Sequence, residues 1–144
     1  MLFLNKLFRC DCPVTSALDV VGDKWTLVII KLMLLEHKKT FKDFYESDES
    51  IAPNILSTRL KTLLKTGFIN KVNHPDNKKT FIYNLTEQGL SLTPVITELA
   101  RWSHNNVRES DIYMLNMNVN NKSKLNQQII DKYKEIVLLS VLLG

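Results

Sequence analysis

The polar and basic side chains between residues 53 and 80 have the types and the spacing needed to contact nucleic acid. This window holds six Lys or Arg and one Asp, a net charge of +5, whereas the whole chain carries +4. On a helical wheel at about 100° per residue, four polar side chains fall opposite the leucine face that begins at Leu56. They are Asn54, Thr58, Lys61 and Lys65, with Ser57 at the edge of their stripe. Asn and Thr can hydrogen-bond to base edges and lysines can neutralise phosphates, so the stripe predicts a DNA-recognition helix.

A β-hairpin is expected directly after this helix. Gly67 favours the left-handed conformation that ends a helix, and strand-like residues then occupy 68–72 and 80–85 around a polar loop. The loop contains His74, Lys78 and Lys79, which are placed to contact the DNA backbone or the minor groove. Helix, hairpin and basic tip in this order are typical of a winged helix-turn-helix.

Three further helices must position the recognition helix, and we expect them over residues 13–21, 24–36 and 41–46. Residues 24–36 are apolar on nearly every side, which predicts a buried central helix. Thr40 and Asp43 have the spacing of a capping box, and Phe41 and Phe44 are expected to point inward. The predicted fold class is mostly α (α+β), a winged helix-turn-helix with a two-stranded β-wing and C-terminal dimerisation helices.

The expected domain organisation ends in a dimerisation region. We predict an N-terminal arm over 1–12, a DNA-binding domain over 13–86, a dimerisation helix over 87–105, and a linker (114–123) plus an amphipathic helix within 106–144. A stripe of apolar side chains at helical spacing is expected at the dimer interface, and it consists of Leu92, Val95, Leu99 and Trp102, joined by Ile136 and Val137 from the last helix. A two-fold dimer would read two half-sites about one helical turn apart.

The final segment, residues 136–144, is apolar all round, and its use remains open between three alternatives. It could pack into the dimer interface, dock on a membrane surface or another partner, or be disordered in the isolated chain. No apolar run in the chain reaches the roughly 18 residues that a membrane span needs.

Other reactive side chains give weaker signals. Cys12 precedes a helix N-terminus, where the helix dipole can lower a thiol pKa, so it is a redox-sensing candidate; the alternative is an inert thiol. Cys10 lies too near for an unstrained intrachain disulfide, which favours a bond between subunits. The histidines are scattered, and the sequence has neither a Gly-rich phosphate loop nor a catalytic triad motif. We therefore expect no metal, no cofactor, no enzymatic activity and, with two cysteines only, a cytoplasmic location.

Two other function classes are alternatives to DNA binding. A winged-helix protein-interaction module without specific DNA binding would present an acidic or apolar recognition face, and Lys61 and Lys65 argue against one. A small enzyme with an unfamiliar site is the other class, and the sequence holds nothing that favours it.

The chain resembles the HxlR-type regulators, winged-helix proteins similar to the MarR type. The matching motifs are Cys12-Pro13, residues 18–25 (LDVVGDKW), Phe41, residues 51–64, Gly67-Phe68-Ile69, residues 83–89 (YNLTEQG) and Trp102. The resemblance covers about residues 10 to 106 and implies a homodimeric transcription factor on an inverted-repeat DNA operator, commonly a repressor. Some members respond to electrophiles or oxidants through an N-terminal cysteine, which implies a small-molecule or oxidant effector. Ala52 departs from the family's Ser and forfeits a side-chain N-cap worth about 1 kcal/mol.

Overall fold

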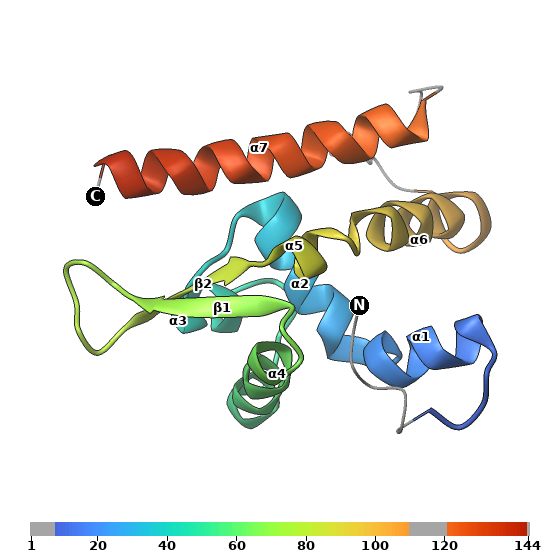
Figure 1. Cartoon of the computed structure of the whole chain (residues 1–144), viewed down its shortest axis with the longest axis horizontal. Helices are drawn as coiled ribbons and strands as arrows, with labels where there is room; N and C mark the ends of the chain where they lie inside the picture. The colour runs from blue at the N-terminus through green and yellow to red at the C-terminus, as the bar shows by residue number, and fades with distance from the viewer. Residues whose placement is uncertain (1–7, 110–120, 144) are drawn as a thin grey trace.

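The computed structural model describes residues 8–109 and 121–143. Its elements in chain order are α1 (Pro13–Val21), α2 (Lys24–Glu36), α3 (Phe41–Tyr45), α4 (Pro53–Lys65), β1 (Ile69–Asn73), β2 (Phe81–Leu85), α5 (Glu87–Leu90), α6 (Thr93–Asn106) and α7 (Lys122–Leu143). Figure 1 shows the hairpin projecting at one end, α1 and α6 at the other, α4 below the hairpin and α7 across the top. The predicted winged helix-turn-helix with a two-stranded wing is confirmed. Residues 1–7 of the expected arm and most of the expected linker lie outside the described residues.

Helix α2 is the centre of the core, as its all-round apolar sequence predicted. Ile29, Ile30 and Met33 have no exposed surface. The helix begins at a strong cap, because a carboxylate oxygen of Asp23 accepts hydrogen bonds from the amides of Trp25 at 3.0 Å and of residue 26 at 2.9 Å. The other helices and the wing pack around this buried element.

Helix α3 begins with the predicted capping box. The Asp43 amide donates to the Thr40 hydroxyl at 3.1 Å, and the Asp43 carboxylate accepts from the Thr40 amide at 3.0 Å. Phe44 is fully buried, as expected. The expectation for Phe41 was wrong, since its ring is 38% exposed. Phe41 occupies the first position of a five-residue helix, at the edge of the core that Phe44 fills.

The recognition helix and the wing are joined by a tight exit turn. Gly67 adopts φ +81°, a conformation that strains any residue with a side chain, and the chain then enters β1. The two strands pair antiparallel from Ile69 opposite Leu85 to the other end of the hairpin. The wing is also held to the α2–α3 loop, because the Tyr83 amide donates to the Lys39 carbonyl at 2.8 Å.

The single helix expected over 87–105 is broken into α5 and α6. Pro94 lies in the first turn of α6, where its missing N–H is not needed. In a continuous helix its ring would clash with the carbonyl of Leu90. The Thr93 hydroxyl instead donates to that carbonyl at 2.7 Å, which satisfies it at the break.

Helix α7 packs on its own chain. It begins at Lys122, inside the segment that was expected to be a linker. Tyr133 is only 5% exposed and its hydroxyl accepts a hydrogen bond from the buried Leu85 amide at 2.8 Å. The Thr97 hydroxyl donates to Asn126 Oδ1 at 2.8 Å, which joins α6 to α7. No helix among the described residues is both long and apolar enough to cross a membrane.

Candidate nucleic-acid interface

Helix α4 is fixed to the core by one face. Leu56, Leu60 and Leu63 are at most 3% exposed, which confirms the predicted leucine face. Beside them, Arg59 Nε lies 3.5 Å from a carboxylate oxygen of Asp23. This ion pair joins α4 to the residue that caps α2. The orientation of the arginine is therefore coupled to the N-terminus of α2.

The charge state of Asp23 is set by several opposing influences. Burial raises the pKa of this carboxyl, but hydrogen bonds from the Thr26 hydroxyl and from the amides of Thr26 and Trp25, with the charge of Arg59, outweigh burial. The pKa of Asp23 therefore lies below its ordinary value, and the carboxylate stays ionised as the anchor of α4.

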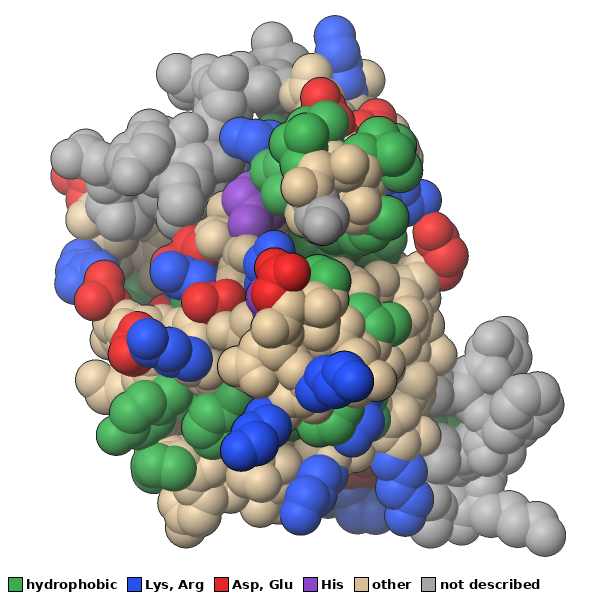
Figure 2. All heavy atoms as spheres, turned by 90° about the vertical axis from the view of Figure 1, so that its left-hand side faces the viewer, with side chains coloured by type: hydrophobic (Ala, Val, Ile, Leu, Met, Phe, Trp, Pro, Cys, Tyr) green, Lys and Arg blue, Asp and Glu red, His purple; other side chains and the backbone are tan. Residues whose placement is uncertain are grey.

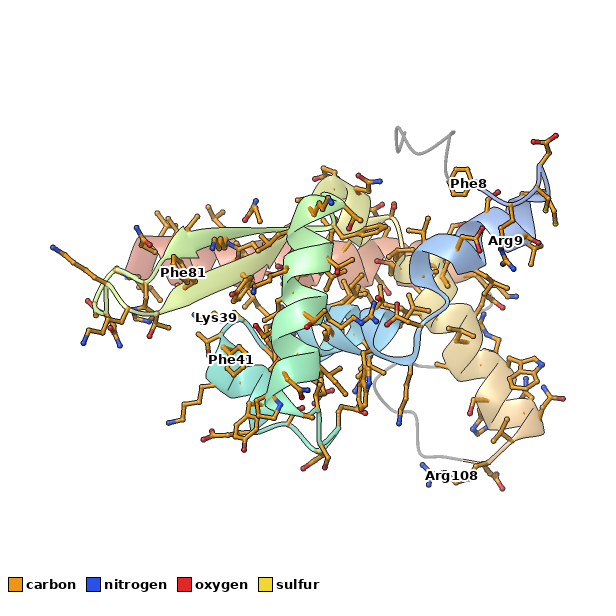
Figure 3. All side chains as sticks on the ribbon, turned by 90° about the horizontal axis from the view of Figure 1, so that it is seen from below. Phe8, Arg9, Lys39, Phe41, Phe81 and Arg108 are labelled. Atoms are coloured by element: carbon orange, nitrogen blue, oxygen red, sulfur yellow. The ribbon has the colours of Figure 1, made fainter. Side chains whose placement is uncertain are left out.

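The opposite face of α4 carries the predicted polar stripe. Asn54, Thr58, Lys61 and Lys65 are all exposed, and Ser57 at the edge is half-buried. The Thr58 hydroxyl donates to the Asn54 carbonyl at 2.9 Å, so its proton is used within the helix and its lone pairs remain free to accept. Figure 3 looks onto this face and shows α4 crossing the front of the domain.

Thr62 lies next to the predicted polar stripe but was not predicted to belong to it. Its side chain is exposed on the flank of the stripe, and its hydroxyl donates to the Thr58 carbonyl at 3.1 Å. The wheel position of Thr62, about 120° from the leucine face, was the available signal.

The first turn of α4 has no side-chain cap among the described residues. Ala52 provides no side-chain cap, as its sequence predicted, and Pro53 has no N–H. The amides at the start of the helix therefore keep their hydrogen-bonding capacity, at the end where the helix dipole is positive. Such an end is suited to a phosphate group.

The wing tip adds a second basic surface. Lys78 and Lys79 are exposed, and no ion pair involves either of them within 8–109 or 121–143. The amide of Asp76 donates to His74 Nδ1 at 3.1 Å, which places the proton of a neutral His74 ring on Nε2. Figure 2 faces this end of the molecule and shows Lys and Arg side chains gathered over its lower part.

The expected dimer face is only partly exposed. Val95, Leu99 and Trp102 on α6 are 40%, 50% and 61% exposed, whereas Leu92 packs on the core of its own chain. Val137 on α7 likewise packs against this core, and Ile136 is half-buried beside it, so part of their apolar surface is already covered. Two apolar side chains of α1, Val14 (66%) and Leu18 (57%), are exposed at the same end of the molecule as α6 (Figures 1 and 3).

Cys12 is exposed at the N-cap of α1. The pKa of the Cys12 thiol is lowered chiefly by a hydrogen bond from the backbone amide of Thr15. The Thr15 hydroxyl and the amide of Val14 lower it further, whereas burial acts in the opposite direction. This is the influence of a helix N-terminus that the sequence suggested. Cys10 is also exposed and free. Within the described residues, no group of three His, Cys, Asp or Glu side chains is arranged to hold a metal ion.

Comparison with known proteins gives the same assignment as the geometry. Residues 20–111 match the family model described as HxlR-like helix-turn-helix. YybR of Bacillus subtilis (strain 168), an HTH-type transcriptional regulator, is 29% identical over 113 residues, which cover 78% of this chain and 90% of YybR. The structure of PA1607 matches with a TM-score of 0.63 at 30% identity, over 72% of this chain and 70% of PA1607.

A third relative has been solved in several chemical states. The HTH-type transcriptional regulator YodB of Bacillus subtilis (strain 168) is 32% identical over 93 residues, which cover 64% of this chain and 82% of YodB. Its reduced form matches with a TM-score of 0.55 at 28% identity, over 71% of this chain and 100% of YodB. Diamide-treated and quinone-bound forms of YodB match as well. The chain described here belongs to the HxlR-like helix-turn-helix family of MarR-like, DNA-binding transcriptional regulators.

Proposed function

We propose that this chain is a sequence-specific transcriptional repressor that binds an inverted-repeat operator in double-stranded DNA as a homodimer. The observation that carries the proposal is the polar stripe of α4, exposed along its length while the opposite leucine face is locked into the core. The basic wing tip supports it, because Lys78 and Lys79 are exposed and form no ion pair with any residue that the structure describes. Four side chains of α4 and two of the wing would then contact the DNA.

The stripe divides between base reading and charge neutralisation. The Asn54 amide can pair with N6 and N7 of an adenine. Thr58, whose proton is already donated to the Asn54 carbonyl, would accept from the amino group of adenine or cytosine. Lys61 and Lys65, one and two turns further along, would contact phosphates, and Lys78 and Lys79 would extend these contacts from the wing.

Dimerisation through α6 supplies the two-fold symmetry. Val95, Leu99 and Trp102 form an exposed apolar stripe, and burying each in an interface would contribute roughly 1.5–3 kcal/mol before the entropic costs of association. Two recognition helices related by a two-fold axis would reach half-sites about one helical turn apart. The free energy by which one winged helix discriminates between DNA sequences would then be doubled.

Cys12 would make the repressor responsive to oxidants or electrophiles. Its lowered pKa favours the thiolate, which is the nucleophilic form. With a quinone the thiolate forms a carbon–sulfur bond, and the ring gains a proton to become a hydroquinone. With diamide, two thiols from two subunits form a disulfide, and diamide takes up their two electrons and two protons. The diamide-treated and quinone-bound forms of YodB support this part of the proposal.

The proposal can be tested by fluorescence anisotropy, which measures the affinity of the protein for DNA duplexes taken from the region upstream of its own gene. Thr58→Val keeps the shape of the side chain and should lower the ratio of operator affinity to random-DNA affinity by about tenfold. Thr66→Val is the matched control, because its hydroxyl makes the same bond to the carbonyl four residues earlier, near the core side of α4. A variant with alanine at 54, 58, 61 and 65 that binds operator as well as the wild type would overturn the assignment of the recognition helix.

A further inference from the structure

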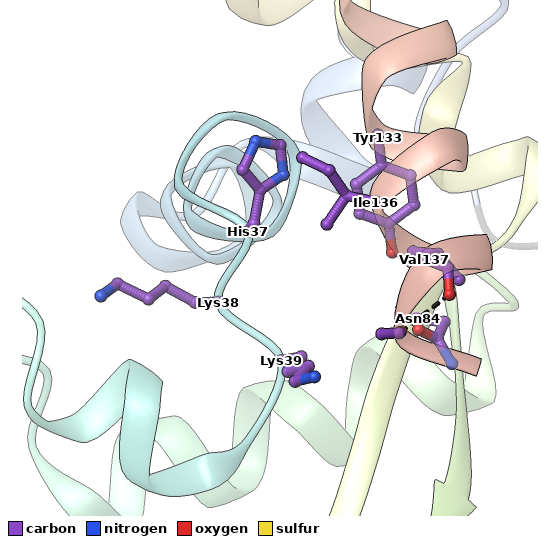
Figure 4. A pocket seen from close by; sticks show the side chains of 8 residues that line it. His37, Lys38, Lys39, Asn84, Tyr133, Ile136 and Val137 are labelled. Atoms are coloured by element: carbon purple, nitrogen blue, oxygen red, sulfur yellow. Dashed lines mark hydrogen bonds between the residues drawn. The ribbon is translucent and has the colours of Figure 1, made fainter. Parts of the chain in front are cut away.

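A cleft lies between the C-terminal half of α7, the α2–α3 loop and the side of the wing, where it reaches from Asn84 to the wing loop. Its volume is about 500 Å³, in the range of small-molecule sites. It continues into a smaller cavity of about 70 Å³ beside the end of α2. Four residues line both spaces: Lys39, Asn84, Val137 and Ser140. Figure 4 shows His37 and Lys39 on one side of the smaller cavity and Tyr133, Ile136, Val137 and Asn84 on the other.

One end of this cleft is polar and cationic. His37 Nδ1 is buried and has no hydrogen-bond partner among the described residues. Burial, followed by the charge of Lys132, lowers the pKa of His37, which favours the neutral form of the ring. Lys39 forms no ion pair within the described part of the chain, and the amide group of Asn84 adds a further donor. Among the described residues of the lining, Asp76 alone is acidic, and it lies in the wing loop.

The rest of the cleft is walled by apolar side chains from two elements. The wing contributes Val72 and Ile82, and α7 contributes Val137, Val141 and Leu143. Val72 is 50% exposed and Val141 is 71% exposed, so these walls keep apolar surface in contact with solvent. An occupant with an apolar chain or ring would remove this surface from water.

The cleft is remote from the proposed dimer face. Figure 1 places the wing and the end of α7 at one end of the molecule and α1 and α6 at the other. A dimer formed through α6 would therefore leave the cleft open. The α7 half of the lining also lies beyond residues 20–111, so the family match does not account for it.

We propose that this cleft binds a small monocarboxylate with an apolar chain or ring, with the carboxylate at Lys39 and His37 and the apolar part between Ile82 and Val141. The charge of the polar end and the apolar walls together select this chemistry over a neutral or cationic ligand. The inference deepens the proposed function by naming an effector class, because such a ligand would touch both the wing and α7. Binding itself is independent of DNA.

Isothermal titration calorimetry of the full chain with decanoate tests the site. Decanol serves as the neutral probe of equal chain length. We expect decanoate to bind about tenfold more tightly than decanol. The substitution Lys39→Gln should lower the affinity for decanoate by about tenfold and leave the affinity for decanol unchanged. Lys124→Gln, at the far end of α7 and outside the cleft lining, is the matched control for charge and should bind as the wild type does.

Two variants of exposed α7 residues test the location. Ser140→Trp fills the space that both cavities share and should abolish binding, whereas Ser123→Trp on the first turn should not. Val141→Asp places a negative charge in the apolar wall and should weaken decanoate more than decanol. Equal affinities for decanoate and decanol, or undiminished binding by both Ser140→Trp and Val141→Asp, would overturn the proposal. Neither result depends on operator binding, so failure of the site and failure of the DNA-binding proposal are distinguishable.

Discussion

The wing lysines allow the DNA interface to be tested quantitatively. Lys78→Gln combined with Lys79→Gln removes two positive charges per subunit and four per dimer. Both side chains are exposed and without ion pairs among the described residues, so the substitutions should leave the fold unchanged. Each phosphate contact contributes about 0.9 to the slope of log affinity against log salt concentration, so four lost contacts should make the slope shallower by about 3.6.

The expected change in the salt dependence of DNA affinity is large enough to measure in an ordinary salt titration. Between about 50 and about 200 mM salt, a slope difference of about 3.6 means that the wild type loses about a hundredfold more affinity than the variant. Fluorescence anisotropy on the operator and on random DNA of the same length measures both slopes. The two duplexes should show the same change, because phosphate contacts carry no sequence information.

A matched variant separates contact from net charge. Lys124→Gln combined with Lys132→Gln removes the same charge from α7, which lies on the opposite side of the molecule from α4 (Figure 1). We expect this variant to keep a slope close to that of the wild type. If both double variants change the slope equally, the wing does not contact phosphates and the reasoning is refuted.

Three further predictions address the cysteine, the dimer and the C-terminal helix. In a Cys10→Ser background, the rate of Cys12 alkylation should reach half its maximum at a pH below the ordinary thiol pKa of about 8.5. The substitution Thr15→Val should raise this midpoint pH. An unshifted midpoint would contradict the assigned role of the Thr15 hydroxyl. Trp102→Asp should produce monomers with poor operator affinity, and sedimentation velocity showing an unchanged dimer would exclude α6 from the interface. Tyr133→Phe leaves the buried β2 amide without its acceptor and should lower the free energy of unfolding in urea by about 1–3 kcal/mol, so a smaller loss would mean that water replaces the hydroxyl.

Local sequence signals were sufficient for the DNA-binding half of the chain. The capping box of Thr40 and Asp43 and the exit turn at Gly67 each depend on residues close together in sequence. The leucine face of α4 also fixed which side chains are exposed, because helical periodicity determines both faces at once. The stripe from Asn54 to Lys65 could therefore be predicted before any tertiary contact was known.

Some of the differences between the expected and the observed structure could also have been predicted from the local sequence. Pro94 carries the signal for the break between α5 and α6, since a proline cannot continue a helix from the preceding turn. Phe41 differs because a hydrophobic residue at a helix start is buried only if the core extends that far, and the core ends at Phe44.

The arrangement of α7 was decided by tertiary structure alone. Its sequence predicted an apolar stripe, but the stripe could have met another subunit, a membrane or its own domain. Tyr133 and the Leu85 amide are 48 positions apart, and their hydrogen bond exists only because α7 packs across α2 and α6. The cleft that joins His37 to the wing likewise depends on three segments that are distant in sequence. Periodicity determines which face of a helix is apolar, whereas the three-dimensional packing of the whole chain determines what that face contacts.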